Sequence, residues 1–352
     1  MRILERAGEA VIRGMVALHI CYLHCNEEQT VKSWFIQSGA ERTSVELREV
    51  PVPEPKAGEL LAKVHAAGLN RGEFIAGHGL SGGSAKAAGI EAAAEVVKLG
   101  EGVTQFKPGD RVMGRAYHAF SEFAIFRIGD AMPAPAKLSW EEAAGAGIAY
   151  LTAYDMLWPG GALKAGEWLL VAGASAGVGV ASVQLGKLIG ARVIGTSGSA
   201  EKLKKLQALG MDLGLQNRNG GFEKAVMEAT GGKGVDLVVN NVGGSVFAEC
   251  IRVLAYRGRL ATVGYVDGVV KAELDILALH AKRLKLYGVS NKLRSAAEIA
   301  EGVRGFTRDV LPSFASGHLR TVIDRVFPFA ELAQAKAHME SNAHLGKIIL
   351  RA

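Results

Sequence analysis

Cysteine is scarce in this chain, and long apolar runs are missing. The 352 residues include three cysteines, Cys21, Cys25 and Cys250. Three thiols provide no disulfide framework, so we expect a reducing cytoplasm. His19 and His24 stand beside the first two cysteines, but one cluster lacks the second, separated ligand pair of a structural zinc site. No apolar run is long enough to cross a membrane, so we expect no membrane association.

A dominant charge of one sign is also lacking. The 41 lysines and arginines are interspersed with 35 aspartates and glutamates, which leaves a net charge of +6. The chain has no basic stripe with interleaved aromatic residues, and a nucleic-acid partner is therefore not expected. The positive excess favours a phosphorylated cofactor as the ligand.

The first thirty residues differ from the rest. Residues 1–30 begin with charged side chains and continue into an apolar patch at 14–25, which polar residues interrupt and flank. No small-residue cleavage site follows the patch, so a secretory signal is not expected. We interpret residues 1–30 as an N-terminal extension without a catalytic role.

From Val31 the pattern becomes regular, and the chain is long enough for two domains. Alternating strands are expected at 31–36 and 45–50, and further strands surround glycine-rich and Pro-Gly-Asp turns up to about residue 135. Ser139, with Glu142 three residues later, predicts a capping box that opens a helical stretch. The first part of the regular region is therefore expected to be mostly β.

The most informative segment is EWLLVAGASAGVGVASVQLGKLIGARVIGT, residues 167–196. An apolar strand enters a turn of small residues at 173–179, and a helical pattern and a second strand follow. The pyrophosphate of a dinucleotide must approach the backbone at such a turn, which excludes bulky side chains. In the usual G-x-G-x-x-G register only Gly179 remains, with Ala174 and Ala176 at the first two glycine positions. An ordinary glycine-rich connection is the alternative, which the flanking strands and helix make the weaker interpretation.

Strands and helices alternate after this turn. Candidate strands lie at 168–171, 192–196, 213–217, 235–240, 258–264 and 283–289. Helical patterns separate the later strands, at 200–209, 222–230, 245–254 and 276–282. Six strands are the number of a complete doubly wound parallel sheet. A short tail, with expected helices at 296–314 and 329–340 and strands at 322–327 and 347–350, is too small to stand alone and should fold back onto the β region.

Five blocks follow one another in an order that carries a family resemblance. They are PVPEPKAGELLAKVHAAGLNRGEF, GIEAAAEVVKLGEGVTQFKPGDRVMG, LSWEEAAGAGIAYLTAY, LKAGEWLLVAGASAGVGVASVQLGKLIGARVIGTSGSAEKL and HLGKIIL. In this order the chain resembles the medium-chain dehydrogenase/reductase superfamily, and more closely its zinc-independent quinone oxidoreductase branch. The resemblance implies an α/β fold with two domains and an active-site cleft between them. The GroES-like β-rich catalytic domain would take 31–152 and 290–352, and a Rossmann domain with a doubly wound parallel six-stranded sheet would take 153–289.

The zinc ligands of the superfamily's alcohol dehydrogenases have no counterpart in this sequence. Those enzymes hold catalytic zinc with a cysteine near the 68–70 block and a histidine beside a glutamate, at positions that Asn70 and Ile90 take here. The four closely spaced cysteines of the structural zinc lobe are missing as well. A lone Glu91 will not hold zinc tightly, so no metal site is predicted. Without a Lewis acid, simple alcohol dehydrogenation is not expected.

The resemblance also implies where the reaction takes place. Asn70 is expected near the nicotinamide and Thr152 beside its carboxamide, both as catalytic residues. Each has an alternative, because Asn70 could only close a turn and Thr152 could bond its own helix backbone. A polar amide in an apolar stretch needs a partner, which favours an Asn70 that faces the substrate. The expected cofactor-binding residues are Ala174, Ser175, Ala176, Gly177, Val178, Gly179, Thr196, Ser197, Ser199, Lys202, Arg218, Asn241, Val242, Gly243, Gly264, Tyr265 and Lys347.

One departure from the family concerns the proton donor. Many quinone reductase relatives place a tyrosine shortly after the Asn70 block, whereas this chain reads RGEFI at 71–75. No phenol is available there. Glu73 could be a carboxylate of the site, but we favour an exposed turn residue. The glycine- and alanine-rich segment 77–89 is expected to form a mobile loop that sets substrate specificity.

The residues after the second Rossmann strand favour NADPH over NADH. NAD-selective folds of this type place an Asp or Glu there to bind the ribose hydroxyls, but this chain reads GTSGS at 195–199. No acid is present to repel a 2′-phosphate. Lys202 and Arg218 follow, and although either could be a solvated surface charge, two cations near a hydroxyl-rich pocket favour NADPH.

Together these patterns predict an NADPH-dependent oxidoreductase that transfers hydride to a quinone without zinc. The resemblance implies a homodimer that acts on a small molecule, either a quinone or an unsaturated carbonyl compound, and the scarcity of cysteine favours the cytoplasm. An enal or enone (alkene) reductase of the same superfamily is the enzyme alternative. The non-enzyme alternative is an NADPH-binding structural or regulatory protein that kept the fold and lost turnover.

Overall fold

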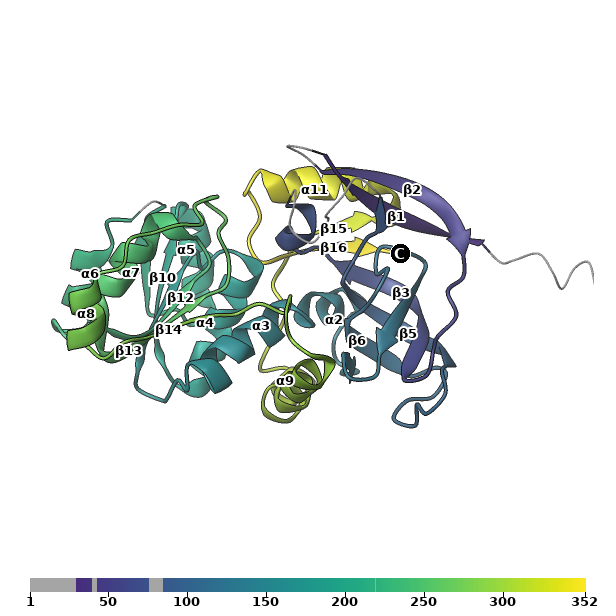
Figure 1. Ribbon diagram of the computed structural model, residues 1–352, viewed down its shortest axis with the longest axis horizontal. Helices are drawn as coiled ribbons and strands as arrows, with labels where there is room; N and C mark the ends of the chain where they lie inside the picture. The colour runs from purple at the N-terminus through teal and green to yellow at the C-terminus, as the bar shows by residue number, and fades with distance from the viewer. Residues whose placement is uncertain (1–29, 40–42, 76–84, 219) are drawn as a thin grey trace, which may run out of the picture.

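The chain folds around two main sheets that lie side by side. The computed structural model describes residues 30–39, 43–75, 85–218 and 220–352. Nearly all of the predicted N-terminal extension and most of the predicted loop at 77–89 therefore lie outside the described residues. Figure 1 shows a parallel sheet flanked by helices, a second body rich in strands, and the C-terminus in that second body.

The first body is a six-stranded sheet in which every neighbouring pair is parallel. Its strands are β9 (Trp168–Ala172), β10 (Arg192–Ser197), β11 (Leu213–Gln216), β12 (Val235–Asn240), β13 (Leu254–Thr262) and β14 (Lys285–Gly288). The order β11-β10-β9-β12-β13-β14 is that of the doubly wound dinucleotide fold. The predicted fold class is confirmed. In such a sheet, ligands bind outside the carboxyl ends of the strands where the order reverses, here between β9 and β12.

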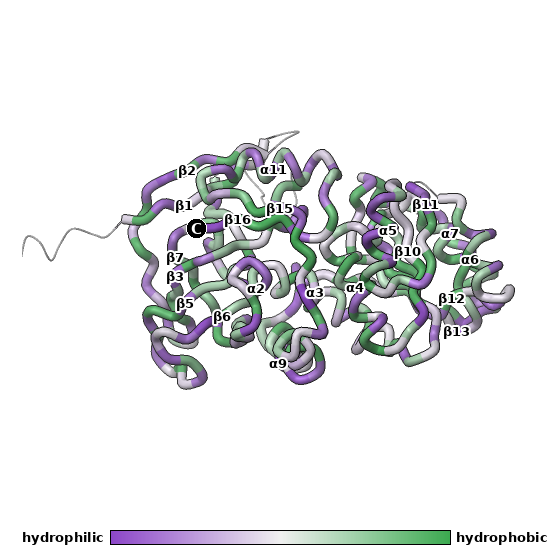
Figure 2. The backbone as a smooth tube through the Cα atoms, turned by 180° about the vertical axis from the view of Figure 1, so that it is seen from behind, coloured by the Kyte–Doolittle hydropathy of each residue, from purple (hydrophilic) through white to green (hydrophobic). Residues whose placement is uncertain are grey.

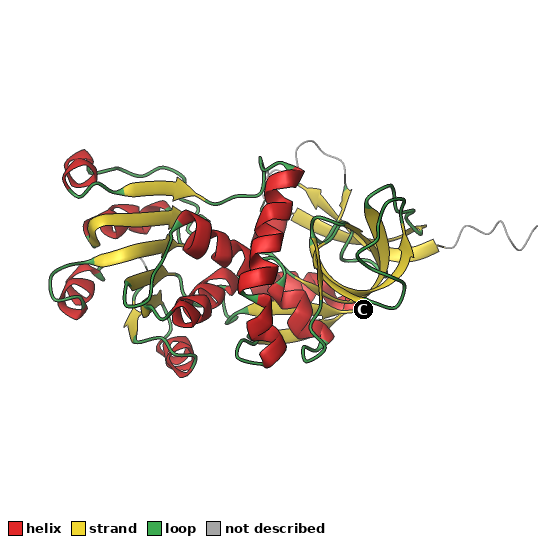
Figure 3. Cartoon of the chain, turned by 90° about the horizontal axis from the view of Figure 1, so that it is seen from below, coloured by secondary structure: helices red, strands yellow, loops and turns green. Residues whose placement is uncertain are grey.

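Helices cover both faces of this sheet, as Figure 3 shows. They are α4 (Gly177–Ile189), α5 (Ala200–Ala208), α6 (Glu223–Ala229), α7 (Phe247–Arg252) and α8 (Ile276–Ala281), with the short 3₁₀ turn η3 (Gly244–Val246) before α7. Local chemistry sets their ends. Gly190 ends α4 in the left-handed region at φ 89°, which glycine adopts without strain. The Ser199 hydroxyl caps α5 by accepting the N–H of Lys202.

The second body joins both ends of the chain in one sheet of order β15-β16-β3-β5-β6-β8, with β7 also paired to β3. Its strands are β3 (Glu59–Gly68), β5 (Glu91–Leu99), β6 (Arg111–Arg115), β7 (Phe123–Arg127), β8 (Ala131–Pro133), β15 (Ile323–Pro328) and β16 (Lys347–Arg351). A smaller sheet contains β1 (Thr30–Ser38), β2 (Thr43–Pro51) and β4 (Lys86–Ala87). The C-terminal strand thus packs beside the end of β3. The predicted domain limits stay a prediction.

The remaining helices lie in and around the second body and the junction. They are η1 (Arg71–Phe74), α2 (Trp140–Ala146), α3 (Ala149–Asp155), the π-helix η2 (Met156–Gly160), α9 (Ala296–Asp309), α10 (Leu311–Ser316), η4 (Phe329–Glu331) and α11 (Leu332–Glu340). The capping box predicted at Ser139 and Glu142 is confirmed, with N–H to oxygen distances of 3.1 and 3.0 Å. The single helix predicted at 296–314 is wrong. It breaks at Val310, because Pro312 is accommodated only in the first turn of a new helix.

A continuous apolar core runs through the junction of the two bodies. It contains Met113 from β6, Leu169 from β9, and Tyr150 and Phe306 from the connecting helices, all nearly or fully buried. The strands β10 and β12 are mostly buried, and Figure 2 shows hydrophobic and hydrophilic residues alternating along the chain between such strands and the turns that join them. The Tyr150 hydroxyl donates to the carbonyl of Arg320 at 3.0 Å, which satisfies its buried polar end. Shared burial of this kind fixes the carboxyl edge of the parallel sheet against β16 and β3.

Candidate active site

The turn between β9 and α4 has the geometry of a phosphate cradle. Gly173 has φ 75°, and its N–H donates to the Thr196 hydroxyl at 3.1 Å, which ties the turn to the end of β10. A Cβ on Gly179 would lie 2.4 Å from the carbonyl oxygen of Gly173, so only glycine lets α4 pack this closely. The N-cap of α4 is Ala176, whose methyl group cannot cap the first N–H groups. The N–H groups of Ala174 and Ala176 donate to the carbonyls of Thr196 and Gly173. The N–H groups of the first turn of α4, residues 177–179, are therefore the backbone donors that an anion can use.

The neighbouring strand end is organised by a residue that the sequence analysis missed. Asn240, fully buried at the end of β12, accepts the N–H groups of Val242 and Gly243 at 2.9 and 3.0 Å. Its amide donates to the Gly243 carbonyl at 2.9 Å. Asn241 donates to the carbonyl of Ala172 at 3.0 Å, so the predicted residues 241–243 are held against the end of β9. The paired asparagines after an apolar strand were the available signal.

The end of β13 completes this edge. Val263 donates its N–H to the carbonyl of Asn240 at 3.1 Å, and a Cβ on Gly264 would lie 3.4 Å from the carbonyl oxygen of Asn241. Tyr265 follows and is partly buried. Three strand ends that were predicted separately therefore meet at one edge of the sheet.

Hydroxyls and two cations gather beyond β10. The hydroxyls of Ser175 and Ser197 lie 3.4 Å apart. The Lys202 ammonium donates to the carbonyl of Asn342 at 2.8 Å. Burial lowers the pKa of Lys202, and the positive charge of Arg218 lowers it further, whereas the negative charge of Asp324 raises it. The two predicted cations are thus close enough to influence each other. Their role toward a 2′-phosphate stays a prediction.

The turn after β9 touches the second body through the backbone. Gly346 donates its N–H to the carbonyl of Ser175 at 3.0 Å, and Ala176 forms a bridge with Gly346. A Cβ on Gly177 would meet the Lys347 side chain at 3.0 Å. The next residue after this contact, Lys347, points its ammonium into a polar cluster in the second body.

A buried ion pair forms the centre of that cluster. The Lys347 ammonium donates to Glu91 Oε2 at 2.7 Å, to Asn70 Oδ1 at 3.0 Å and to the Leu69 carbonyl at 2.9 Å. Glu91 is fully buried and Lys347 is 4% exposed. Glu91 Oε1 also accepts the N–H of Ile148 at 2.5 Å. Both buried charges are paired and hydrogen-bonded, which is what makes such a pair tolerable in a core.

Three donors serve three acceptors at Lys347, so its ammonium has no N–H left over in this structure. The cofactor-binding role expected for this residue stays a prediction. Its observed contacts instead fix Asn70 and Glu91. The sequence analysis missed the pair, although a lysine before three apolar residues in β16 and a glutamate before three alanines in β5 are unusual in buried strands.

Asn70 stands at the end of β3 and is partly buried. Its amide nitrogen donates to Glu91 Oε2 at 3.0 Å, while its oxygen accepts from Lys347. A Cβ on Gly68 would lie 2.6 Å from Glu91 Oε2, so a glycine before Asn70 lets the strand approach the carboxylate. The amide therefore has protein partners on both sides. Contact with a substrate stays a prediction.

The prediction that Glu73 is an exposed turn residue is wrong. Glu73 is partly buried in η1, and its Oε1 accepts the backbone N–H of Asn70 at 3.2 Å. Burial raises the Glu73 pKa to about 8, although the ammonium of Lys347 opposes the shift. A carboxylic acid that holds its proton near neutral pH thus adjoins Asn70.

Thr152 lies in α3 and is partly buried. Its N–H donates to the carbonyl of Ile148 at 2.9 Å within the helix. Its hydroxyl bonds none of the residues that the structure describes, so the alternative of a bond to its own helix backbone is not observed. Contact with a nicotinamide stays a prediction.

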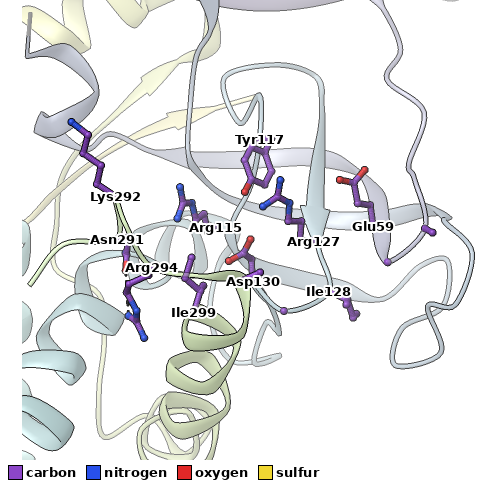
Figure 4. A pocket seen from close by; sticks show the side chains of 14 residues that line it. Glu59, Arg115, Tyr117, Arg127, Ile128, Asp130, Asn291, Lys292, Arg294 and Ile299 are labelled. Atoms are coloured by element: carbon purple, nitrogen blue, oxygen red, sulfur yellow. Dashed lines mark hydrogen bonds between the residues drawn. The ribbon is translucent and has the colours of Figure 1, made fainter. Parts of the chain in front are cut away.

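A separate pocket of about 360 Å³ lies between strands of the second body and the segment 291–299, which leads into α9. In Figure 4 the carboxylate of Asp130 lies near the side chains of Arg115 and Arg127, beside the ring of Tyr117. Burial raises the pKa of Asp130, and the two arginines oppose that shift. The two arginines of this pocket therefore face a buried carboxylate of the same pocket.

A doubly wound sheet with a small-residue phosphate turn, joined to a strand-rich body, defines a dinucleotide-binding class of protein. Residues 177–303 match the family described as "Zinc-binding dehydrogenase", and residues 56–133 match "Alcohol dehydrogenase GroES-like domain". Quinone oxidoreductase of Rattus norvegicus is 30% identical over 310 residues, which cover 86% of this chain and 92% of that protein. The chain belongs to the medium-chain dehydrogenase/reductase superfamily, a family of oxidoreductases, in the branch that contains the quinone oxidoreductases.

Two further matches are a much longer curated protein and a solved structure. A phenolphthiocerol/phthiocerol polyketide synthase of Mycobacterium tuberculosis is 32% identical over 89% of this chain. The chain spans only 15% of the length of that protein. Among solved structures, mycobacterial Rv1454c, complexed with NADPH, has a TM-score of 0.81 at 27% identity and covers 92% of this chain and 100% of its own.

The family description names zinc, and the residues around Asn70 do not fit it. Among residues 30–39, 43–75, 85–218 and 220–352, no group of three or more His, Cys, Asp or Glu side chains could hold a metal ion. Glu91 already accepts bonds on both oxygens, and one of its partners is the ammonium of Lys347. A cation beside that ammonium would be repelled, and amide and carboxylate oxygens are poor zinc ligands without thiolate or imidazole. Over the same described residues, no helix is long and apolar enough to span a membrane.

Proposed function

We propose that this protein is an NADPH-dependent reductase that transfers hydride to a quinone without zinc. The observation that carries the proposal is the main-chain contact between Ser175 of the phosphate turn and Gly346, the residue directly before Lys347 of the Asn70 cluster. This contact brings a nucleotide-binding edge and a polar, buried charge cluster together. An acceptor bound there would lie between the two bodies.

The residues of the turn fit a dinucleotide phosphate. The close approach at Gly179, the uncapped first turn of α4 and the hydroxyls of Ser175 and Ser197 would hold the cofactor. NADPH, when bound, supplies the hydride. Asn241, Gly243 and the residues after β13 would border its ring.

A quinone suits the charges of this cluster better than an alcohol does. Hydride addition to a quinone places negative charge on an oxygen that one hydrogen bond can stabilise, so no Lewis acid is needed. Alcohol oxidation without a metal lacks that help. Asn70 and Thr152, both partly exposed, are the proposed groups that meet the acceptor and the cofactor ring.

An alkene reductase is the second candidate, favoured by the 32% identity with a polyketide synthase. The two are separated by following NADPH oxidation with 1,4-benzoquinone and with an enal side by side, before and after treatment with a chelator. The proposal expects the larger kcat/KM for the quinone and unchanged activity after chelation. Preference for the enal would select the second candidate, and loss of activity with the chelator would refute the zinc-free mechanism. Tight NADPH binding with no acceptor turned over would indicate a binding protein.

Selectivity for NADPH should depend on Lys202 and Arg218. Each charge-assisted contact to a 2′-phosphate contributes about tenfold in affinity after solvent screening of these partly or fully exposed side chains. The double variant Lys202→Ala/Arg218→Ala should therefore lose roughly 100-fold in NADPH affinity and almost nothing in NADH affinity. The difference should shrink as salt rises. Fluorescence titration with both cofactors measures this, and equal weakening toward both would speak against a phosphate clamp.

We also propose that two copies assemble through the edge of the parallel sheet. β14 forms one edge, where backbone groups are open to a further strand. Apolar side chains stand exposed in the segment before it, namely Val266, Val269, Val270, Ile276 and Leu277. Light scattering should give the mass of a dimer for the wild type and that of a monomer for Ile276→Asp/Leu277→Asp. A monomeric wild type at micromolar concentration contradicts this assembly.

A further inference from the structure

We propose that Glu73 is the acid that gives a proton to the reduced acceptor, an inference that rests on the proposed function. Three observations place it there. First, the cluster around Lys347 holds one more carboxyl group than it has positive charges. Second, the hydrogen bonds favour Glu73 as the carboxyl that holds a proton. Third, Glu73 lies beside Asn70 and keeps part of its surface exposed.

The cluster holds two carboxyl groups and one ammonium. Glu91 and Glu73 lie near Lys347, which carries the single positive charge directed into the cluster. Arg71, the nearest other cation in η1, is turned away, because its guanidinium donates to the carbonyl of Met339 and to Asn342 Oδ1. Two ionised carboxylates would leave one partly buried negative charge without a counter-charge, and desolvation makes this costly. This cost favours a proton on one of the two carboxyls.

The hydrogen bonds decide which carboxyl takes that proton. Glu91 is paired directly with the Lys347 ammonium and also accepts the N–H of Ile148 and the amide of Asn70. Glu73 accepts only from Asn70, through the backbone N–H at 3.2 Å and the side-chain amide at 3.5 Å, and both bonds end on Oε1. Oε2 of Glu73 bonds none of the described residues. A proton on Oε2 leaves both bonds intact and keeps one O–H available as a donor.

The position of Glu73 suits proton transfer. It follows Asn70 by three residues, keeps part of its surface exposed, and belongs to the short turn η1 rather than to the core of β3. Burial raises its pKa to about 8, close to the pH at which the protein would work. A general acid is most effective when its pKa lies near the working pH.

The step balances in atoms and charge. After the hydride has formed an O–H bond on one quinone oxygen, the other oxygen carries the negative charge of the hydroquinone monoanion. The O–H bond at Glu73 Oε2 breaks, a new O–H bond forms on that oxygen, and hydroquinone and the Glu73 carboxylate result. Water returns the proton to Glu73 before the next turnover. The groups that face Glu73 during this cycle are Lys347 from β16, Glu91 from β5 and the Asn70 amide.

Glu73→Gln tests the proton donor, because glutamine can still accept the Asn70 N–H but has no acidic proton. The variant should lose about 100-fold in kcat/KM, the lower limit for a general acid. The wild-type kcat/KM should fall tenfold per pH unit above about pH 8, whereas the residual activity of Glu73→Gln should not change with pH. Its NADPH affinity should stay within about twofold of the wild type. Glu101→Gln, at an exposed turn, is the matched control and should behave like the wild type.

A second measurement, the pH dependence of folding stability, tests the protonation of Glu73 without catalytic turnover. The pKa of Glu73 is raised in the folded state, so its stabilising effect is complete below the unfolded value of about 4.5 and is lost as pH rises through about 8. Between these limits, the folding equilibrium constant of the wild type should fall about tenfold per pH unit relative to that of Glu73→Gln. Parallel stability curves would overturn the proposal.

The outcomes separate this inference from the function on which it rests. If the wild type reduces an acceptor and Glu73→Gln keeps its rate and pH profile, the acid role is refuted and the reductase stands. If the wild type reduces no quinone or enal, the proposed function falls, and the acid role falls with it, whatever the stability curves show.

Discussion

Replacing Lys347 with methionine should lower the free energy of unfolding by about 3 to 5 kcal/mol, the effect of removing one partner of a buried ion pair. Methionine fills a similar volume but donates no hydrogen bond, so Glu91 would stay fully buried without its counter-charge. Asn70 Oδ1 and the Leu69 carbonyl would lose the same donor. Denaturation by urea, followed by circular dichroism, measures the loss, with the slope of the transition checked for two-state behaviour.

The matched control also removes the negative charge of Glu91, which Lys347→Met leaves unpaired. In the double variant Lys347→Met/Glu91→Gln the buried site is neutral, and glutamine can still accept the Ile148 N–H. The double variant should therefore recover most of the lost stability, because a buried pair contributes little compared with the penalty of breaking it. A Lys347→Met variant within about 1 kcal/mol of the wild type, or a double variant no more stable than the single one, would contradict the buried pair.

The parallel sheet could be predicted because its signals are local. Each strand is an apolar run closed by a turn, and the small residues at 173–179 mark the one connection that must admit a phosphate. The same local reasoning failed at 296–314, where the helical pattern continues through Pro312. Apolar spacing did not reveal that the proline begins a new helix after Val310.

The cluster around Asn70 could be predicted only in part, because its partners are distant in sequence. Glu91 and Lys347 are 256 positions apart, and no sequence pattern within β5 or β16 predicts that the two side chains pair. Glu73 illustrates the same limit. A glutamate followed by phenylalanine in a short turn is expected to be exposed, and nothing local to 71–75 predicts a partly buried acid with a raised pKa near Lys347 and Glu91.

Gly179→Leu should abolish NADPH binding while leaving most of the fold intact. Even a methyl group at this position would lie 2.4 Å from the carbonyl oxygen of Gly173 and 2.8 Å from the main chain of Ala174. Backbone atoms cannot rotate away as a side chain can, so α4 must move off the turn and carry its first N–H groups with it. The loss of two charge-assisted bonds to a phosphate corresponds to about 3 to 5 kcal/mol, or more than 100-fold in affinity.

Gly186→Ala provides the matched control, because it adds a methyl group to the same helix where the nearest atom is Leu169 Cδ2 at 2.7 Å. The end of a leucine side chain can shift, so this variant should lose some stability but keep its NADPH affinity within about threefold. Gly179→Ala should fall between the two, with weaker binding and a near-native circular dichroism spectrum. Titration calorimetry with NADPH on the three folded variants measures the series. Equal affinities across it would mean that the phosphate does not bind at the turn between β9 and α4.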